Sequence, residues 1–175
     1  MKILGIYGSP RKGGNTDTLL DEALKSAESC GAEVSTIRVC DLNISGCIEC
    51  GSCDDTGECV VDDDMNQVYP RLLEADAIVL AAPMFFYSVP AQAKALIDRC
   101  QAMWCKRMLE KTREKLRSYD SGKGYFIAVG ATKGATLFDG TKLLAKYWYD
   151  ALDMSFEDGL YLRSVEKMDA IKKLP

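Results

Sequence analysis

The 175-residue sequence contains no histidine. Since histidine is the usual acid–base group near neutral pH and a frequent metal ligand, any catalysis or metal binding must use other groups. The sequence also lacks the glycine motifs G-x-G-x-x-G and G-x-x-x-x-G-K-[ST], which mark dinucleotide and ATP sites. We therefore expect no histidine chemistry, and we assign no catalytic side chain.

Long apolar segments are missing as well. The first residues, MKILGIYGSPRKGG, hold an apolar run of a short strand's length before glycines and basic residues, which fits neither a signal peptide nor a membrane span. The net charge of -4 disfavours a nucleic acid as the main partner, although residues 106–120 are locally basic. These features predict a cytoplasmic protein without a membrane or nucleic-acid partner.

Cysteine, in contrast, is plentiful and clustered. Four of the eight cysteines fall in the stretch GCIECGSCDDTGEC, with the spacing C-x2-C-x2-C-x5-C. Without histidine, a metal held here is bound by thiolates alone, which suits a four-cysteine iron–sulfur cluster or a closed zinc site, and the tight triple favours the cluster. The predicted ligands are Cys47, Cys50, Cys53 and Cys59.

Other interpretations of the cysteines stay open. Free thiols or zinc are alternatives in the loop, whereas disulfides are disfavoured because the cytosol is reducing. Six carboxylates between residues 54 and 64 should lower the potential of a nearby cluster, or they cap a helix and solvate the loop. The cysteines outside the motif are predicted to be small core residues without chemistry: Cys30, Cys40, Cys100 and Cys105.

Short apolar segments alternate with amphipathic helices along the chain. Strands are expected at residues 2–8, 33–39, 76–82, 123–130 and 158–164. Helices are expected at 17–29, 62–74, 96–104 and 143–152, with Pro70 kinking or shortening the second. This order predicts one compact α/β domain over residues 1–175, with a doubly wound parallel sheet and ligands at the carboxyl ends of its strands.

Three loops follow predicted strands and could form a ligand site. Residues 8–18, GSPRKGGNTDT, combine glycines, short polar side chains and a helix start, which predicts a cradle for one terminal phosphate or, alternatively, an ordinary capped turn. Residues 83–90, PMFFYSVP, suit a flat aromatic ring, or else core or subunit contacts. Residues 130–135, GATKGA, are small enough to let backbone amides approach a heteroaromatic edge.

These segments, taken in order, resemble a known family. GSPRKGGNTDTLLDEAL, the cysteine loop running into DDDM, PMFFYSVPAQAKALIDR and VGATKG are similar to the NADPH-dependent FMN reductase-like proteins of flavodoxin fold, in particular their iron-sulfur flavoprotein subgroup. The resemblance implies a flavodoxin-like five-stranded parallel sheet, FMN at its carboxyl edge, and a homodimer or homotetramer. It also implies a 4Fe-4S cluster on the loop at 47–59, approaching the flavin across a subunit interface.

The resemblance further implies three groups of FMN-binding residues. The phosphate would be held by Ser9, Arg11, Asn15, Thr16 and Thr18. The isoalloxazine ring would be lined by Pro83, Met84, Phe85, Phe86, Tyr87 and Ser88. The pocket would be completed by Gly130, Ala131, Thr132, Lys133 and Gly134.

The implied function is that of an FMN-dependent oxidoreductase. Electrons would pass between NAD(P)H or a ferredoxin-type donor, the flavin and the cluster, with flavin N5 as the reactive centre. The alternatives are a flavodoxin-like electron carrier without a substrate pocket and a cluster-free NAD(P)H-dependent FMN or quinone reductase. The proteins of this family often carry another helix after the last strand, and residues 168–175 stand in the place of that helix here. We therefore expect one edge of the sheet, or an interface, to be less covered.

Overall fold

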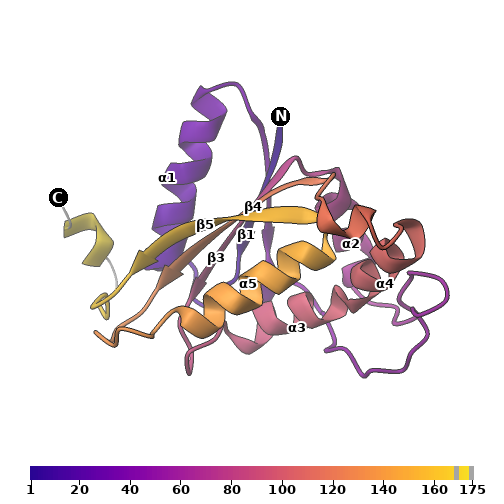
Figure 1. Ribbon diagram of the computed structural model, residues 1–175. Coiled ribbons are helices and arrows are strands. Elements are labelled where there is room, and N and C mark those ends of the chain that lie inside the picture. Colours follow the sequence, from indigo (N-terminus) through magenta and orange to yellow (C-terminus); the bar gives the residue numbers. More distant parts are fainter. Residues whose placement is uncertain (168–169, 174–175) are drawn as a thin grey trace.

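The computed structural model describes residues 1–167 and 170–173, which form a five-stranded parallel sheet flanked by helices (Figure 1). The spatial order of the strands is β2-β1-β3-β4-β5, with every neighbouring pair parallel. Their bounds are β1 Lys2–Tyr7, β2 Glu33–Arg38, β3 Ala77–Pro83, β4 Gly122–Val129 and β5 Met154–Leu162. This is the flavodoxin order, in which the winding direction reverses between β1 and β3, and it confirms the predicted fold class.

The helices divide unequally between the two faces of the sheet. Helix α1, Asn15–Ser29, lies on one face, and Figure 1 shows α3 and α5 on the opposite face. The helices that pack on that opposite face are α2 Met65–Glu74, α3 Ala91–Arg99, α4 Gln101–Glu110 and α5 Asp139–Ala151. Short 3-10 turns occur at Val39–Asp41, Lys115–Arg117 and Ala170–Lys173.

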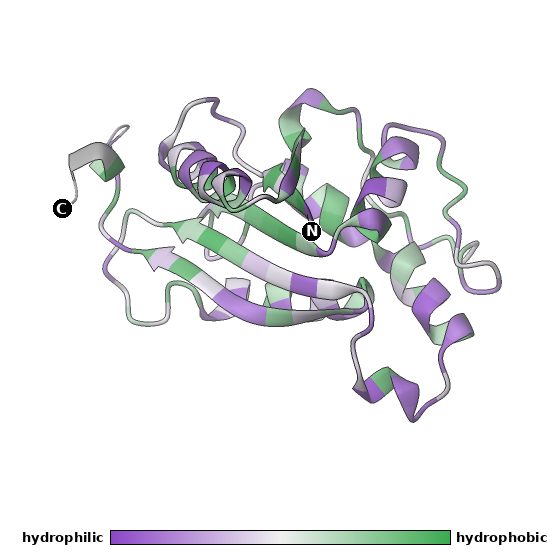
Figure 2. Cartoon of the chain, turned by 90° about the horizontal axis from the view of Figure 1, so that it is seen from above, coloured by the Kyte–Doolittle hydropathy of each residue, from purple (hydrophilic) through white to green (hydrophobic). Residues whose placement is uncertain are grey.

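Alternating strand residues supply the two apolar cores. Leu4 and Ile6 of β1 face the larger core on the side of α2 to α5, whereas Ile3 faces the smaller one, where Leu20 and Leu24 of α1 are buried. Such alternation follows from the two-residue repeat of a strand. Figure 2 shows hydrophobic residues concentrated along the middle of the sheet, with hydrophilic residues on the outer sides of the helices.

The face under α1 is covered only in part. Among the described residues α1 is the only α-helix on this face, and it contacts β1 to β4. Leu160 of the edge strand β5, which pairs with Ile127 and shares its face, is 44% exposed. The expectation of a less covered edge stays a prediction, because residues 168, 169, 174 and 175 of the segment that prompted it lie outside the described residues.

Three predicted boundaries differ from the structure. The single helix expected at 96–104 is two helices, because Cys100 leaves helical geometry with a ψ of 3°. The fifth strand begins at Met154 rather than 158, since pairing with β4 starts there despite the charged residues that follow. Helix α2 is shorter than predicted, because Asp63 accepts a hydrogen bond from the Met65 amide and starts the helix there, while Pro70 remains inside it.

The last feature of the helices is their length and polarity. Among residues 1–167 and 170–173, no helix combines the length and the apolar character needed to cross a bilayer.

Candidate functional site

The loop after β1 turns tightly around the end of the sheet. The amide of Gly8 donates to the carbonyl of Ala81 over 2.8 Å, and a Cβ at this position would lie 3.2 Å from the Ala93 Cβ. Glycine therefore allows the loop to cross directly over β3. Ser9 is buried next to it, and its Oγ accepts a 3.1 Å hydrogen bond from the Arg11 amide. These contacts hold the backbone of the loop against β3.

The first turn of α1 faces the same loop. Thr16 is buried there, and the first amides of a helix have no intrahelical acceptor, so they can bind an anion. Two other predicted ligands already have protein partners. The Thr18 hydroxyl donates to the Gly14 carbonyl over 3.2 Å, and Asn15 Nδ2 donates to the Lys167 carbonyl over 2.9 Å. Asn15 therefore ties the cradle to the segment after β5.

Asp17, which sequence analysis did not single out, stabilises this cradle. Its Oδ2 accepts 2.9 Å and 2.8 Å hydrogen bonds from the Gly13 amide and from Arg38 Nη1. The carboxylate is almost completely buried, and the Arg38 guanidinium compensates its charge. Its position in the first helical turn was the only sequence signal for this role.

The aromatic loop after β3 is a two-residue hairpin turn. Phe85 and Ser88 exchange backbone hydrogen bonds of 2.8 Å and 3.0 Å, and between them Phe86 and Tyr87 have φ angles of 49° and 61°. Positive φ in bulky residues is strained by about 1–3 kcal/mol each and tends to occur at functional sites. The buried Thr141 hydroxyl, 3.4 Å from the Tyr87 carbonyl, supports the turn.

This turn presents its aromatic rings to solvent. Phe86 is fully exposed and Phe85 and Tyr87 are about half exposed, so the alternative of core residues is wrong for all three. Exposed aromatic side chains held on a strained turn are suited to stacking or to contact with a partner.

The loop after β4 is bordered by the segment that follows β5. The Val165 amide donates to the Gly130 carbonyl over 3.1 Å, and the Ser164 amide donates to the Thr132 carbonyl over 3.3 Å. These bonds bring Val165 and Glu166 to the carboxyl edge of the sheet, beside the cradle. The sequence did not predict this contribution, because the end of β5 was misplaced.

All three loops meet at one cavity of about 280 Å3. The predicted residues in its wall are Ser9, Arg11, Asn15, Thr16, Pro83, Met84, Phe85 and Ala131. The predicted residues outside the wall are Thr18, Phe86, Tyr87, Ser88, Gly130, Thr132, Lys133 and Gly134. The wall also contains residues that sequence analysis missed, namely Pro10, Gly14, Val129, Val165 and Glu166. The cavity offers buried hydroxyls and a helix N-terminus at one end and apolar side chains at the other.

The four motif cysteines line a second cavity, of about 560 Å3. They lie on the segment between β2 and α2, whose base is closed by two hydrogen bonds. Asn43 donates to Asp64 Oδ2 over 2.7 Å, and the Asp64 amide donates back to the Asn43 carbonyl over 3.2 Å. Within the described part of the chain, this cavity and the first one share no lining residue.

A buried arginine organises the wall of the cysteine cavity. Arg99 of α3 donates to Asp63 Oδ2 over 2.6 Å and to the carbonyls of Ser45 and Val61 over 3.1 Å each. Burial opposes ionisation of Asp63, but the hydrogen bonds from Arg99 and from backbone amides hold its pKa below the usual range. Arg99 Nε is buried with no hydrogen-bond partner among the described residues. The cavity wall therefore contains a buried Arg99–Asp63 ion pair beside its thiols.

The acidic residues of this segment have structural partners. Asp63 and Asp64 form the bonds given above, and Asp62 accepts a 2.8 Å hydrogen bond from Asn66 Nδ2. The helix-capping alternative therefore accounts for part of the acidic run. Near the first cysteines, a hydrogen bond with the Ser52 hydroxyl lowers the pKa of the Cys50 thiol.

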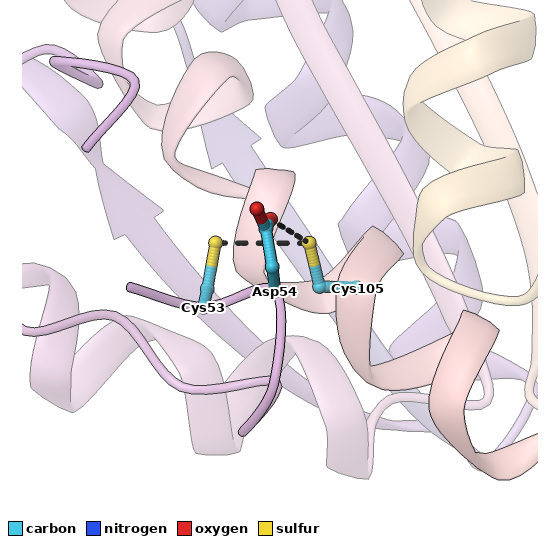
Figure 3. Close-up of side chains that lie close together, drawn as sticks. All are labelled: Cys53, Asp54 and Cys105. Atoms are coloured by element: carbon cyan, nitrogen blue, oxygen red, sulfur yellow. Dashed lines mark hydrogen bonds between the residues drawn. The ribbon is translucent and has the colours of Figure 1, made fainter. Parts of the chain in front are cut away.

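Cys53 and Cys105 lie together at the edge of the cysteine cavity (Figure 3). Their Sγ atoms are 3.7 Å apart, and Cys105 Sγ lies 3.4 Å from Asp54 Oδ1. Burial, together with the hydrogen bonds to Cys53 and Asp54, raises the pKa of Cys105 to about 11. Among the other cysteines outside the motif, Cys100 is a core residue as predicted, but Cys30 is exposed because it follows the end of α1.

Fold and cavities together define a flavodoxin-like α/β protein with a ligand cavity at the carboxyl edge of its sheet and a separate cysteine-lined cavity. The chain belongs to the NADPH-dependent FMN reductase family, whose model matches residues 1–137.

Several similar curated relatives are named iron-sulfur flavoproteins. That of Methanosarcina thermophila is 44% identical over 99 residues, which are 57% of this chain and 52% of the relative. One from Methanocaldococcus jannaschii is 37% identical over 133 residues, which are 76% of this chain and 64% of the relative. One from Archaeoglobus fulgidus is 46% identical over 57% of this chain and 45% of its own length. The chain thus spans between about half and two thirds of these relatives.

Solved structures share the fold at low sequence identity. The NAD(P)H:quinone oxidoreductase of Methanothermobacter marburgensis has a TM-score of 0.67 at 14% identity, covering 99% of this chain and 92% of that one. The FMN-dependent NADH-azoreductase of Bacillus anthracis has a TM-score of 0.59 at 15% identity, covering 95% and 90%.

Proposed function

We propose that this chain is a flavin-dependent oxidoreductase that binds FMN in the cavity formed by the three loops and a 4Fe-4S cluster in the cysteine cavity. The observation that carries the proposal is the pair of separate cavities. One combines an anion-binding helix start with apolar walls, and the other is lined by all four motif thiols. The relatives' name, iron-sulfur flavoprotein, supports both the flavin and the cluster.

The residues of the first cavity fit FMN. Ser9 and Thr16 are buried polar groups beside the free amides of the first α1 turn, where a phosphate would bind, and Arg11 can add a charge-assisted bond. Pro83, Met84 and Phe85 would line the ring. The remaining predicted residues, on the turn after β3, on the loop after β4 and at Thr18 of α1, stay part of the proposal.

The residues of the second cavity fit an iron–sulfur cluster. Cys47, Cys50, Cys53 and Cys59 offer only thiolates, and the buried Arg99 supplies a cation beside a group that carries negative charge. When bound, FMN would exchange a hydride or two electrons and the cluster single electrons, so the protein supplies binding, orientation and electrostatics. Arg99 and Asp63 would keep the cysteine segment in place.

The partners follow from the family. Its description favours NADPH as the electron donor, with NADH or a ferredoxin-type donor as the alternatives. We infer a homodimer or homotetramer in which the exposed ring of Phe86 lies near the partner chain, and this would bring one chain's cluster toward the other chain's flavin. A cytoplasmic location fits the eight cysteines, which are all free thiols.

The test is the iron, acid-labile sulfide and FMN content of anaerobically purified protein. We expect about four iron and four sulfide per chain together with FMN. Flavin without iron, after cluster reconstitution has also failed, would leave a cluster-free reductase. Rapid flavin reduction by NADPH or NADH alone supports the enzyme, whereas reduction only by a ferredoxin-type donor would identify an electron carrier.

A further inference from the structure

We propose that Cys53, Asp54 and Cys105 form a second metal site, which binds a thiophilic divalent cation such as Zn²⁺ and competes with the cluster for Cys53 (Figure 3). The metal site stands without the cluster, and only the competition rests on the proposed function. In the residues that the structure describes, these three are the only group of potential ligands whose ligand atoms all lie within 4.8 Å of one another.

Two of the three distances between the ligand atoms match a tetrahedral site, and the third is within 4.8 Å. With Zn–S bonds of about 2.3 Å, two thiolates of a tetrahedral zinc site lie about 3.8 Å apart, and a thiolate and a carboxylate oxygen lie about 3.5 Å apart. The Sγ atoms of Cys53 and Cys105 are 3.7 Å apart, and Cys105 Sγ is 3.4 Å from Asp54 Oδ1. A cation can therefore be bound with little movement of the side chains.

The turn that carries Cys53 and Asp54 is held against helix α4. The Asp54 amide donates to Gly51 over 3.0 Å and the Gly57 amide to Cys53 over 2.8 Å. Gly57 has a φ of 70°, and a Cβ there would lie 2.8 Å from the Lys106 Cα. Only glycine allows this close contact, which places the turn beside Cys105 on α4.

The chemistry of the three ligands selects the class of cation. Two thiolates and one carboxylate suit zinc-like ions and leave a fourth position for water. Cys105 is 7% exposed, and Gln101 Nε2 lies 3.6 Å from its sulfur, where it can orient the ligand. A bound cation would replace the hydrogen bonds that now join the three side chains, and the thiols would release their protons on binding.

The zinc-like ion and the cluster cannot be bound by the same chain at the same time, because both need Cys53. A 4Fe-4S cluster bound by four cysteines needs Cys53 together with Cys47, Cys50 and Cys59, none of which belongs to the compact group. A zinc-like ion on Cys53 and Cys105 therefore leaves the cluster without its third motif ligand. The site would act as a competitor during cluster assembly.

The first experiment uses Co²⁺ as a spectroscopic probe on reduced protein whose Cys47, Cys50 and Cys59 are all replaced by Ala, so that no four-cysteine cluster can form. We expect one Co²⁺ per chain with thiolate-to-cobalt charge-transfer bands and the visible bands of a tetrahedral ion, all displaced by Zn²⁺. Adding Cys105→Ala should abolish these bands. Adding Cys100→Ala, which removes an equally buried cysteine outside the group, should retain them.

The metal site would be disproved if Co²⁺ binding were unchanged by Cys105→Ala, or if the triple variant bound no Co²⁺. Cys105→Ser serves as a second variant if the alanine protein fails to fold, and it should also lose the charge-transfer bands. For the competition, Zn²⁺ should suppress iron uptake during cluster reconstitution of the unmodified protein but not of Cys105→Ala. If the unmodified protein never takes up iron, the proposed function fails, whereas the cobalt result still decides the metal site.

Discussion

Arg99 on α3 and Asp63 on the cysteine segment form an ion pair of 2.6 Å in which the two side chains are 0% and 4% exposed. The pair joins segments 36 residues apart in sequence, and Arg99 also binds two carbonyls of the cysteine segment. Such a pair is costly to break, because the remaining partner stays buried as an uncompensated charge.

Replacing Arg99 should therefore destabilise the protein strongly. Arg99→Met is expected to lower the free energy of unfolding by about 3–5 kcal/mol, measured by urea denaturation. The control is Lys94→Met on the same helix, because the Lys94–Asp98 pair is exposed and its loss should cost about 0.3–0.5 kcal/mol. Similar losses for the two variants would show that the buried pair has no special role.

The cysteine and flavin sites should respond separately to substitution, since their cavities share no lining residue in the described chain. Cys50→Ala or Cys53→Ala should remove iron and leave FMN bound, as determined by metal analysis and flavin absorbance. Cys30→Ala, at an exposed cysteine outside the motif, should keep both groups. Loss of flavin along with iron would contradict the separation.

Substitutions in the proposed phosphate cradle should give the converse result. Asn15→Ala removes the hydrogen bond to the Lys167 carbonyl, and Thr16→Val removes a buried hydroxyl. Each change should weaken FMN binding by about fivefold to tenfold, the equivalent of one hydrogen bond of about 1 kcal/mol, in a fluorescence titration. Iron content should not change. Unaltered FMN affinity in both variants would place the phosphate elsewhere.

Acid stability should depend on Asp153. Burial disfavours its ionised form, but hydrogen bonds from Lys111 and Arg107, of 2.6 Å and 2.8 Å, outweigh burial and hold the pKa of Asp153 below its usual value. A carboxyl whose pKa is lower in the folded state stabilises the protein above its unfolded pKa of about 3.9, and this contribution is lost as the pH falls through the folded pKa.

Asp153→Asn should consequently be less stable than the unmodified protein at pH 7, and the difference should narrow as the pH falls below about 4. Urea midpoints at a series of pH values measure this. Asp98→Asn, which alters an exposed pair, is the control and should show little difference at any pH. A gap between Asp153→Asn and the unmodified protein that stays constant down to pH 3 would disprove the assignment.

The sequence predicts the sheet well, because local patterns determine it. Apolar runs such as residues 76–82 form a buried parallel strand wherever helices cover both faces, whereas the cradle expected from the glycines and the helix start stays a prediction. The start of β5 was harder to predict, because pairing with β4 begins at Met154 and overrides the charges of Glu157 and Asp158. A strand's limits depend on its neighbour as much as on its own residues.

Local sequence patterns could not predict the contacts between segments that are distant in the sequence. Nothing near Cys105 indicates that the turn at Cys53 would lie against it, since 52 residues separate them. The positive φ angles of Phe86 and Tyr87 contradict the preferences of aromatic residues, so no turn signal exists in PMFFYSVP. Such features come from tertiary packing, and they lie in or beside the candidate sites.

The paired hydrogen bonds between Asn43 and Asp64 have a consequence for how such chains can diversify. They close the cysteine segment at its base, so residues 44–63 leave and rejoin the body of the protein at one point. A shorter connection between these two residues would leave the strands on either side in place, and it would uncover Arg99 and Cys105, which are buried against the segment. The cysteine segment is in this sense a self-contained insert between β2 and α2.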